Sequence, residues 1–357
     1  MGDAGDEPWI EAGIEAATAI LDHEARSRWT TTIHRGTGGG TFGGSAIVQF
    51  DSPDERFVVK VIRRNDTAAD HPLHWRRELD VYGSQWLQDR LPDGMVLPRC
   101  HASAVTDTAG VIVMEAVAFD DPGHRSVDWY ADLAVELGRF SGATLDATDA
   151  PRWATRGFVA YEAQAAAEVF AAMLAEPVDH IRELVERWRP FLRQLTPAIG
   201  ELVADLNDQP SSLNHLDIFS RNATRVGERY VVIDWAYAGI AAIGSDATAV
   251  VVISAIFGDV DMGEFDVFSD AVLSGFIRGL DESGVDIPAD RVRRCIDREV
   301  TLRFARFLSQ LHSIGEEIPT VIEAVSGRTF EDALSSWLAL AEALAPYAER
   351  TLAAVDT

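Results

Sequence analysis

The sequence is almost without lysine. Its 357 residues contain a single one, Lys60, although Lys and Arg together number 31. A Walker A motif requires a lysine directly after a glycine-rich loop, so this motif is excluded, because Lys60 lies inside the apolar segment 57–62. Since arginine meets almost every other need for positive charge in this chain, the lone lysine indicates a position that requires a compact cation.

Cysteine, positive charge and export signals are also scarce. Cys100 and Cys295 have neither the spacing of a metal site nor the density of a disulfide framework, which suits a reducing cytoplasm. The 57 acidic residues exceed the 31 basic ones, and the formal net charge of −26 disfavours binding to nucleic acid and to anionic membranes. The N-terminus lacks a basic segment and an apolar core, and no apolar run approaches a membrane span, so we expect a cytoplasmic protein without a membrane partner. The sequence indicates no particular oligomeric state.

Lys60 is expected on the buried face of a strand. Side chains alternate across a strand, so Lys60 shares a face with Val58 and Ile62, and its ammonium would leave water unless an anion meets it. A phosphate group is one such anion. The alternative is a lysine at a strand end whose long side chain reaches solvent.

The first third of the chain predicts a sheet preceded by a helix. Apolar residues recur at helical spacing from residue 8 to about residue 28. Short segments rich in β-branched residues and divided by turn residues follow, and one helix interrupts them at 72–91. The expected strands are 30–35, 45–50, 56–63, 99–106 and 110–115.

The remainder predicts helices with one exception. From residue 126 onward, helical patterns recur at 126–146, 158–175, 178–207, 245–257, 262–281, 288–312 and 329–354. The exception is 213–234, which predicts a loop followed by two short strands, 223–226 and 230–233. The sequence therefore predicts an α+β fold of two lobes. The expected divisions are an N-terminal helical extension at 1–28, a β-sheet lobe at 29–117 and a mainly helical lobe at 118–357.

A glycine-rich loop, 36–44, separates two expected strands. In a dinucleotide-binding fold such glycines open a helix, but here a strand follows. A strand, glycine loop and strand instead lay backbone amides over phosphates, because glycine permits a close approach. The alternative is a flexible hairpin tip at the surface. The candidate phosphate-binding residues are Gly38, Gly39, Gly40, Thr41 and Gly43.

Glu78 is the candidate partner of Lys60. It lies on the expected helix beside the apolar residues Trp75, Leu79 and Tyr82, at spacings of three and four, which directs it toward the sheet. In that position it can pair with Lys60. The alternative is an exposed surface carboxylate.

The most specific pattern is His215, Asp217 and Asn222, arranged as H-x-D-x-x-x-x-N, followed by Asp234 at the end of an apolar strand. Phosphoryl transfer requires a carboxylate to orient the attacking hydroxyl and oxygen ligands to hold Mg²⁺ against the phosphates. Asp217 suits the first role, and Asn222 and Asp234 suit the second. Residues of these types can also serve only as caps and turn formers.

Taken together, these motifs resemble the protein-kinase-like superfamily. Within it the chain is similar to the aminoglycoside phosphotransferase and choline kinase branch, because Asp234 lies in I-D-W where protein kinases carry D-F-G and no A-P-E segment follows. The resemblance spans about residues 30–255 and implies a bilobal protein-kinase-like fold. It also implies that Lys60 holds the α- and β-phosphates and pairs with Glu78.

The same resemblance assigns roles to the loop around Asp217. It implies that Asp217 is the catalytic carboxylate, that His215 braces the loop, and that Asn222 and Asp234 bind Mg²⁺. The family usually has glycine between this histidine and aspartate, whereas this chain has Leu216.

Two further segments resemble parts of the family. The first, 113–117, resembles the hinge between the lobes, where the backbone of Glu115 and Val117 would hold the adenine. In the second, Asp246 resembles the aspartate that begins the next helix, as a structural cap rather than a ligand.

The resemblance implies an O-phosphotransferase that moves the γ-phosphoryl group of Mg²⁺-ATP, or GTP, to a hydroxyl of a small molecule. One expected acceptor is an aminoglycoside or another amine-bearing antibiotic, with antibiotic resistance as the consequence, because an acidic protein attracts cations. The alternatives are a kinase of a central metabolite such as an amino alcohol or a sugar, and a nucleotide-binding pseudokinase that transfers nothing. An acidic run either meets substrate amines or is a solvated helix start, the interpretation we favour; it consists of Asp259, Asp261, Glu264 and Asp266.

Overall fold

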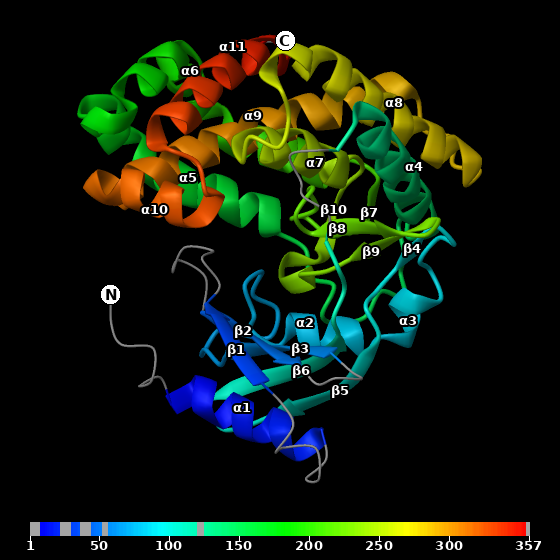
Figure 1. Ribbon diagram of the computed structural model, residues 1–357. Helices are drawn as coiled ribbons and strands as arrows, with labels where there is room; N and C mark the ends of the chain where they lie inside the picture. The colour runs from blue at the N-terminus through cyan, green and yellow to red at the C-terminus, as the bar shows by residue number, and fades with distance from the viewer. Residues whose placement is uncertain (1–7, 22–29, 36–43, 52–55, 120–124, 355–357) are drawn as a thin grey trace.

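A computed structural model describes residues 8–21, 30–35, 44–51, 56–119 and 125–354 (Figure 1). An antiparallel sheet with a helix across it forms one end of the molecule, and helices form the other. Short hairpins lie between these two parts. The expected α+β architecture, with a β-rich first part and a mainly helical second part, is therefore confirmed.

The sheet has the strand order β1-β2-β3-β6-β5, and all its pairs are antiparallel. Lys60 on β3 lies between Ile47 of β2 and Ile112 of β6 in the register. Each expected strand is present within about one residue of its predicted ends. The strands are β1 (Thr30–Arg35), β2 (Ser45–Asp51), β3 (Arg56–Arg63), β5 (Cys100–Val105) and β6 (Ala109–Glu115).

Helix α1 (Pro8–Ile20) packs on the outer face of this sheet. Val59 and Val61 of β3 join its apolar cluster, and a β-carbon on Gly13 would come within 2.3 Å of a Val61 methyl. The helix can lie this close because Gly13 has no side chain. Residues 22–29, the remainder of the expected helix, lie outside the described residues. Because Val59 and Val61 face α1, Lys60 and Ile62 face the opposite side, as predicted from strand alternation.

The single helix expected at 72–91 is wrong. The chain instead forms α2 (Arg77–Tyr82) and α3 (Gln85–Gln88), which are separated at Gly83 and Ser84. The Ser84 hydroxyl caps α3 by accepting the Leu87 N–H at 3.3 Å. Arg77, the first residue of α2, donates from its buried guanidinium to the carbonyls of His71 and Pro72, which holds the segment before the helix in a turn.

The second part contains the predicted helices, with ends shifted by a few residues. Helix α10 and three short 3₁₀ turns were not predicted. The helices are α4 (Val127–Ala143), α5 (Phe158–Ala175), α6 (Arg182–Asn207), α7 (Ser245–Ile256), α8 (Phe265–Glu282), α9 (Ala289–Ile314), α10 (Ile318–Ser326) and α11 (Phe330–Ala353), and the 3₁₀ turns are η3 (Asp179–Ile181), η5 (Met262–Glu264) and η6 (Gly315–Glu317).

Two glycines allow α8 to lie directly on α4. A β-carbon on Gly279 would meet the Val135 carbonyl at 2.0 Å, and one on Gly275 would meet the Ala131 carbonyl at 2.4 Å. These helices join one large apolar core that continues to Leu79 of α2 and Ile62 of β3. The core therefore connects the inner face of the sheet to the helical part.

Five short strands and the 3₁₀ turn η4 (Trp235–Tyr237) lie between sheet and helices. The predicted hairpin is present, although its second strand begins and ends one residue earlier than expected. The antiparallel pair β7–β10 and the two-residue strand β4, which pairs with β9 in parallel, were not predicted. The five strands are β4 (Met95–Val96), β7 (Ser211–Asn214), β8 (Ala223–Val226), β9 (Arg229–Val232) and β10 (Gly239–Ala242).

One helix contradicts the expectation that no segment is apolar enough to span a membrane. Helix α5 has 18 residues and a mean hydropathy of 1.2, so by length and composition alone it passes that test. In the structure it packs on α6 and α9 with Ala163, Ala166 and Phe170 buried, and its Glu162 pairs with Arg306 of α9 at 2.9 Å.

Candidate active site

Lys60 connects three separate elements at the inner face of the sheet. Its Nζ lies 2.7 Å from Glu78 Oε2 on α2 and 2.6 Å from Asp234 Oδ1 just before η4. Lys60 is only 5% exposed and Glu78 only 1%. The predicted pair between Lys60 and Glu78 is therefore present, and the alternatives of a solvent-exposed lysine and a surface carboxylate are wrong.

The charges of this group stabilise one another. Burial alone would lower the pKa of Lys60, but the Asp234 and Glu78 carboxylates raise it above its usual range. Burial would raise the pKa of Asp234, and the Lys60 ammonium outweighs it, so that this pKa is lowered. Burial raises the pKa of Glu78, and Lys60 counteracts part of that rise. Lys60 and Asp234 are thus held in their charged forms.

His215 fixes the loop that follows β7. Its Nε2 donates to the Ile233 carbonyl at 2.9 Å, and its Nδ1 accepts the Asp217 N–H at 3.3 Å. This assignment of donor and acceptor requires a neutral ring, and burial lowers the pKa of His215 to about 4. The ring also packs against Trp235, with centroids 4.7 Å apart. His215 therefore joins the loop to the segment that carries Asp234.

Asp217 and Asn222 lie side by side at the two ends of this loop. The Asn222 side-chain amide donates to the Asp217 carbonyl at 2.8 Å and to its Oδ2 at 3.2 Å. Burial, together with the nearby Asp234 carboxylate, raises the pKa of Asp217 to about 7. The Asn222 carbonyl accepts the Ile233 N–H at 2.9 Å, which ties the loop to the strand before Asp234. The three residues of the H-x-D-x-x-x-x-N pattern and the following Asp234 are thus brought together.

The donor set fits a magnesium ion that also binds phosphates. The Asn222 side-chain oxygen accepts no hydrogen bond from the described residues, and only one oxygen of Asp234 is bonded to Lys60. Among the described residues, no cluster of three or more His, Cys, Asp and Glu could hold a metal alone. Mg²⁺ commonly takes one or two protein oxygens and completes its shell with phosphates and water. Asn222 and Asp234 meet that requirement.

Asp246 at the start of α7 acts on the loop rather than on its own helix. Its two carboxylate oxygens accept the N–H groups of His215 at 3.0 Å and Leu216 at 2.8 Å. The helix cap position itself is Gly244, at φ 96°. The expectation that Asp246 is structural rather than a ligand agrees with these bonds, but the cap assignment is wrong.

Two residues of α9 contact this region, and no sequence signal distinguished them. Arg303 donates to the Leu216 carbonyl at 3.0 Å, and Glu299 is buried with an oxygen that accepts the Ser245 hydroxyl. The Arg303 Nε lies 3.8 Å from Glu299 Oε2. Arg303 is one of thirty arginines and lies in an ordinary helical pattern, so the sequence does not indicate its contact with the Leu216 carbonyl.

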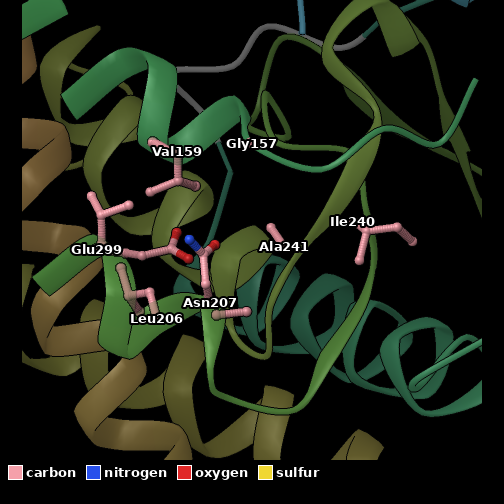
Figure 2. A pocket seen from close by; sticks show the side chains of 10 residues that line it. Gly157, Val159, Leu206, Asn207, Ile240, Ala241 and Glu299 are labelled. Carbon is pink, nitrogen blue, oxygen red and sulfur yellow. The ribbon is translucent and has the colours of Figure 1, made fainter. Parts of the chain in front are cut away.

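Glu299 also lines a small cavity of about 20 Å³ beside the start of α5, the end of α6 and β10 (Figure 2). The polar ends of Glu299 and Asn207 point into this cavity. A volume of this size suits a single water molecule and is far too small for a nucleotide. The cavity is therefore not the nucleotide site.

Glu299 gives a testable dependence of stability on pH. Burial raises its pKa from 4.5 to about 7, so the stabilisation from its protonated form is complete below pH 4.5 and is lost as the pH rises to about 7. Relative to wild type, the free energy of unfolding of Glu299→Gln should therefore increase by about 2 to 3 kcal/mol between pH 5 and pH 8. Urea unfolding across this range measures the effect, with Glu323→Gln at an exposed position as control. Parallel pH profiles of wild type and Glu299→Gln would contradict the assignment.

The remaining predicted site residues belong to two other segments, the end of β6 and the glycine-rich loop. Glu115 ends β6, its N–H donates to the Arg99 carbonyl at 3.0 Å, and its side chain accepts the Arg99 N–H at 2.8 Å. The Val117 N–H forms no hydrogen bond with the described residues. The glycine-loop candidates all lie outside the described residues; they are Gly38, Gly39, Gly40, Thr41 and Gly43.

The acidic run is only in part a solvated helix start. Asp259 is buried and binds Arg221 at 3.0 Å and the Ser220 hydroxyl, so it fixes the loop between Asp217 and Asn222 rather than facing solvent. Asp261 accepts the Gly263 N–H at 2.9 Å at the start of η5, as a cap does. The run therefore offers fewer free carboxylates to a cationic ligand than its sequence suggests.

Solved structures share this fold. An amicoumacin kinase in complex with AMP-PNP and Ca²⁺ aligns with a TM-score of 0.57 at 14% identity over 91% of this chain and 93% of that chain. A spectinomycin phosphotransferase in complex with ADP and spectinomycin gives 0.53 at 15% identity over 94% and 97%. An aminoglycoside phosphotransferase from Alicyclobacillus acidocaldarius gives 0.53 at 16% identity over 94% and 96%. At these identities the likeness establishes the fold, which is protein-kinase-like as expected.

The family follows from the sequence itself. No protein of curated function matches the chain. The model of the phosphotransferase enzyme family, APH, matches residues 43–282, which is more than half of the chain and includes Lys60, Asp217 and Asp234. The chain is therefore an enzyme and belongs to the phosphotransferase enzyme family.

Proposed function

We propose that this enzyme transfers the γ-phosphoryl group of Mg²⁺-ATP or Mg²⁺-GTP to a hydroxyl group of a small molecule. The observation that carries the proposal is the position of Lys60, whose buried ammonium joins Glu78 and Asp234 at 2.7 and 2.6 Å beside the loop of Asp217 and Asn222. A lysine held on a carboxylate of the helix next to the sheet, and placed beside a second carboxylate, is arranged to receive nucleotide phosphates.

The residues divide the reaction between binding and proton transfer. Lys60 would bind the α- and β-phosphates while Glu78 keeps its ammonium in place. Asn222 and Asp234 would hold Mg²⁺, which when bound neutralises phosphate charge. Asp217 would accept the proton of the acceptor hydroxyl. The hydroxyl oxygen would then bond to the γ-phosphorus while the bond between the γ-phosphorus and the bridging oxygen of the β-phosphate breaks. His215 would keep the loop in register with Asp234 through its bonds to Ile233 and Asp217.

The adenine or guanine would lie against the end of β6. There the Val117 N–H is available as a donor, and the Glu115 carbonyl is the corresponding acceptor. The glycine-rich loop would cover the phosphates. The choice between ATP and GTP remains part of the experiment.

The acceptor is proposed to be a hydroxyl compound that carries amines, such as an aminoglycoside. The net charge of −26 supports this choice because it attracts cations. Two proteins of the same fold are named as an amicoumacin kinase and a spectinomycin phosphotransferase. A central metabolite such as an amino alcohol is the second candidate, since an ethanolamine kinase of Plasmodium vivax has the fold too, with a TM-score of 0.53 at 13% identity over 91% of this chain and 84% of that one.

Release of ADP or GDP across a panel of acceptors tests the proposal. The panel contains aminoglycosides, nucleoside antibiotics, macrolides, sugars and amino alcohols, each with Mg²⁺-ATP and with Mg²⁺-GTP. We expect one class to raise nucleotide release above the rate without acceptor. If no acceptor does so, a nucleotide-induced rise in melting temperature shows that the protein binds nucleotide and calls for a wider panel of acceptors, whereas a protein that binds neither nucleotide contradicts the proposal.

A further inference from the structure

The residue directly before Asp217 has an unusual backbone. Leu216 lies at φ 68°, in the left-handed region where a bulky L-residue meets steric strain. Asp234, the other site residue with a positive φ, is of a type that tolerates this region. Leucine is not, and it stands where glycine is usual in the family. Some other part of the protein must therefore hold Leu216 in this conformation.

The peptide groups on both sides of Leu216 are fixed by two charged side chains, the buried Asp246 and the partly buried Arg303. On one side, Asp246 accepts the Leu216 N–H at 2.8 Å. On the other side, the Arg303 Nη1 donates to the Leu216 carbonyl at 3.0 Å. The Leu216 side chain is 1% exposed and belongs to the buried apolar residues. The carbonyl held by Arg303 is part of the peptide bond that leads into Asp217.

Arg303 reaches this carbonyl from a helix that lies outside the matched family region. Helix α9 begins at Ala289, whereas the family model ends at residue 282. The Arg303 side chain is only 17% exposed, and Glu299 one turn earlier on the same helix is its ion-pair partner at 3.8 Å. Glu299 is in turn bonded by Ser245, the residue before Asp246. The hydrogen bonds that Asp246 and Arg303 form with Leu216 are therefore connected through α7 and α9.

We propose that Arg303 is a positioning residue that holds Leu216 in the left-handed conformation and thereby sets the orientation of Asp217. In this chain the arginine would supply the restraint that a leucine requires and a glycine does not. The effect on turnover rests on the proposed function, while the effect on the backbone does not. Arg303 acts through the Leu216 carbonyl and not on a substrate.

A double-mutant cycle of Arg303→Gln and Leu216→Gly tests this dependence. In the wild-type background Arg303→Gln should lower kcat about tenfold, the size expected from the left-handed penalty of an L-residue. Nucleotide KM should change less than about twofold, since no substrate contact is lost. In the Leu216→Gly background the same substitution should lower kcat less than about twofold, because glycine needs no restraint. An equal loss of kcat in both backgrounds would overturn the proposal and indicate that Arg303 acts on Asp217 through its charge, which lowers the pKa of that carboxylate, and not through Leu216.

Arg298→Gln is the matched control. Arg298 lies on the same helix, its side chain is 13% exposed, and it pairs with Asp205 of α6 at 2.7 Å instead of with the loop. Its substitution removes a comparable ion pair, so its effect on kcat should be the same with Leu216 as with Leu216→Gly. If Arg303→Gln does not fold, Arg303→Lys takes its place with the same expected ratio between backgrounds.

Amide hydrogen exchange of the segment 213–219 gives a readout that needs no activity. Arg303→Gln should speed exchange of this segment at least about tenfold, and Arg298→Gln should leave it within about twofold of wild type. Equal exchange in both variants would overturn the proposal. If wild type transfers no phosphoryl group to any acceptor, the proposed function fails, and the exchange rates still decide the role of Arg303.

Discussion

Replacing Asp217 with asparagine is expected to lower kcat about a thousandfold while nucleotide affinity stays within about threefold of wild type. Among the described residues, the Asp217 carboxylate is the only acidic group bonded to Asn222, and its oxygen is the proposed acceptor of the hydroxyl proton. Asparagine keeps the size and can still accept the Asn222 hydrogen bond, but it cannot take up a proton. Steady-state rates with the best acceptor and nucleotide titration by calorimetry measure the two quantities separately.

Asp281→Asn is a suitable control for this substitution. Asp281 is exposed near the end of α8, and the same change of charge there should leave both quantities unaltered. Turnover by Asp217→Asn at the wild-type rate would contradict the assignment of Asp217. A parallel loss of turnover and of nucleotide binding would show that Asp217 maintains the fold of the site instead.

Lys60→Arg is expected to lower kcat/KM for nucleotide about a hundredfold although the charge is retained. Lys60 is 5% exposed, and its ammonium lies within 2.7 Å of two carboxylates that approach from different elements. A guanidinium is larger and planar, so it cannot occupy the same point between Glu78 and Asp234 without displacing one of them. The substitution thus separates the need for a compact cation from the need for positive charge.

Arg63→Lys is the converse control on the same strand. Arg63 is exposed at the end of β3, and exchanging its cation should change kcat/KM by less than about twofold. Near-normal rates in Lys60→Arg would show that the single lysine of this chain is an accident of composition. Measurement of kcat/KM at fixed acceptor concentration distinguishes these results.

The sequence predicted the parts of the site that depend on local patterns. Alternation along β3 was sufficient to place Lys60 on a buried face of the strand with Val58 and Ile62. That this is the inner face followed only from the packing of Val59 and Val61 against α1. The spacing of His215, Asp217 and Asn222 predicted one loop, because these residues are within a few positions of each other. The position of Asp234 at the end of an apolar strand predicted that it would join them.

The contacts that cross long stretches of sequence could not be predicted in this way. Arg303 and Leu216 are separated by 87 positions, and nothing in the helical pattern of α9 directs one arginine to a backbone carbonyl. The break between α2 and α3 was missed because the apolar pattern continues on both sides of Gly83 and Ser84, and the Ser84 cap becomes evident only with coordinates. The bonds of Asp246 to two loop amides similarly depend on how α7 docks behind the loop.

Direct transfer of a labelled phosphoryl group tests the central claim most directly. ATP or GTP with a heavy-oxygen label on the γ-phosphoryl group is incubated with Mg²⁺, the protein and the acceptor that most raises nucleotide release, and mass spectrometry follows the label. We expect a labelled phosphate ester on the acceptor, formed by wild type and not by Asp217→Asn. Label found only in inorganic phosphate, or labelled acceptor formed equally by the variant, would contradict it.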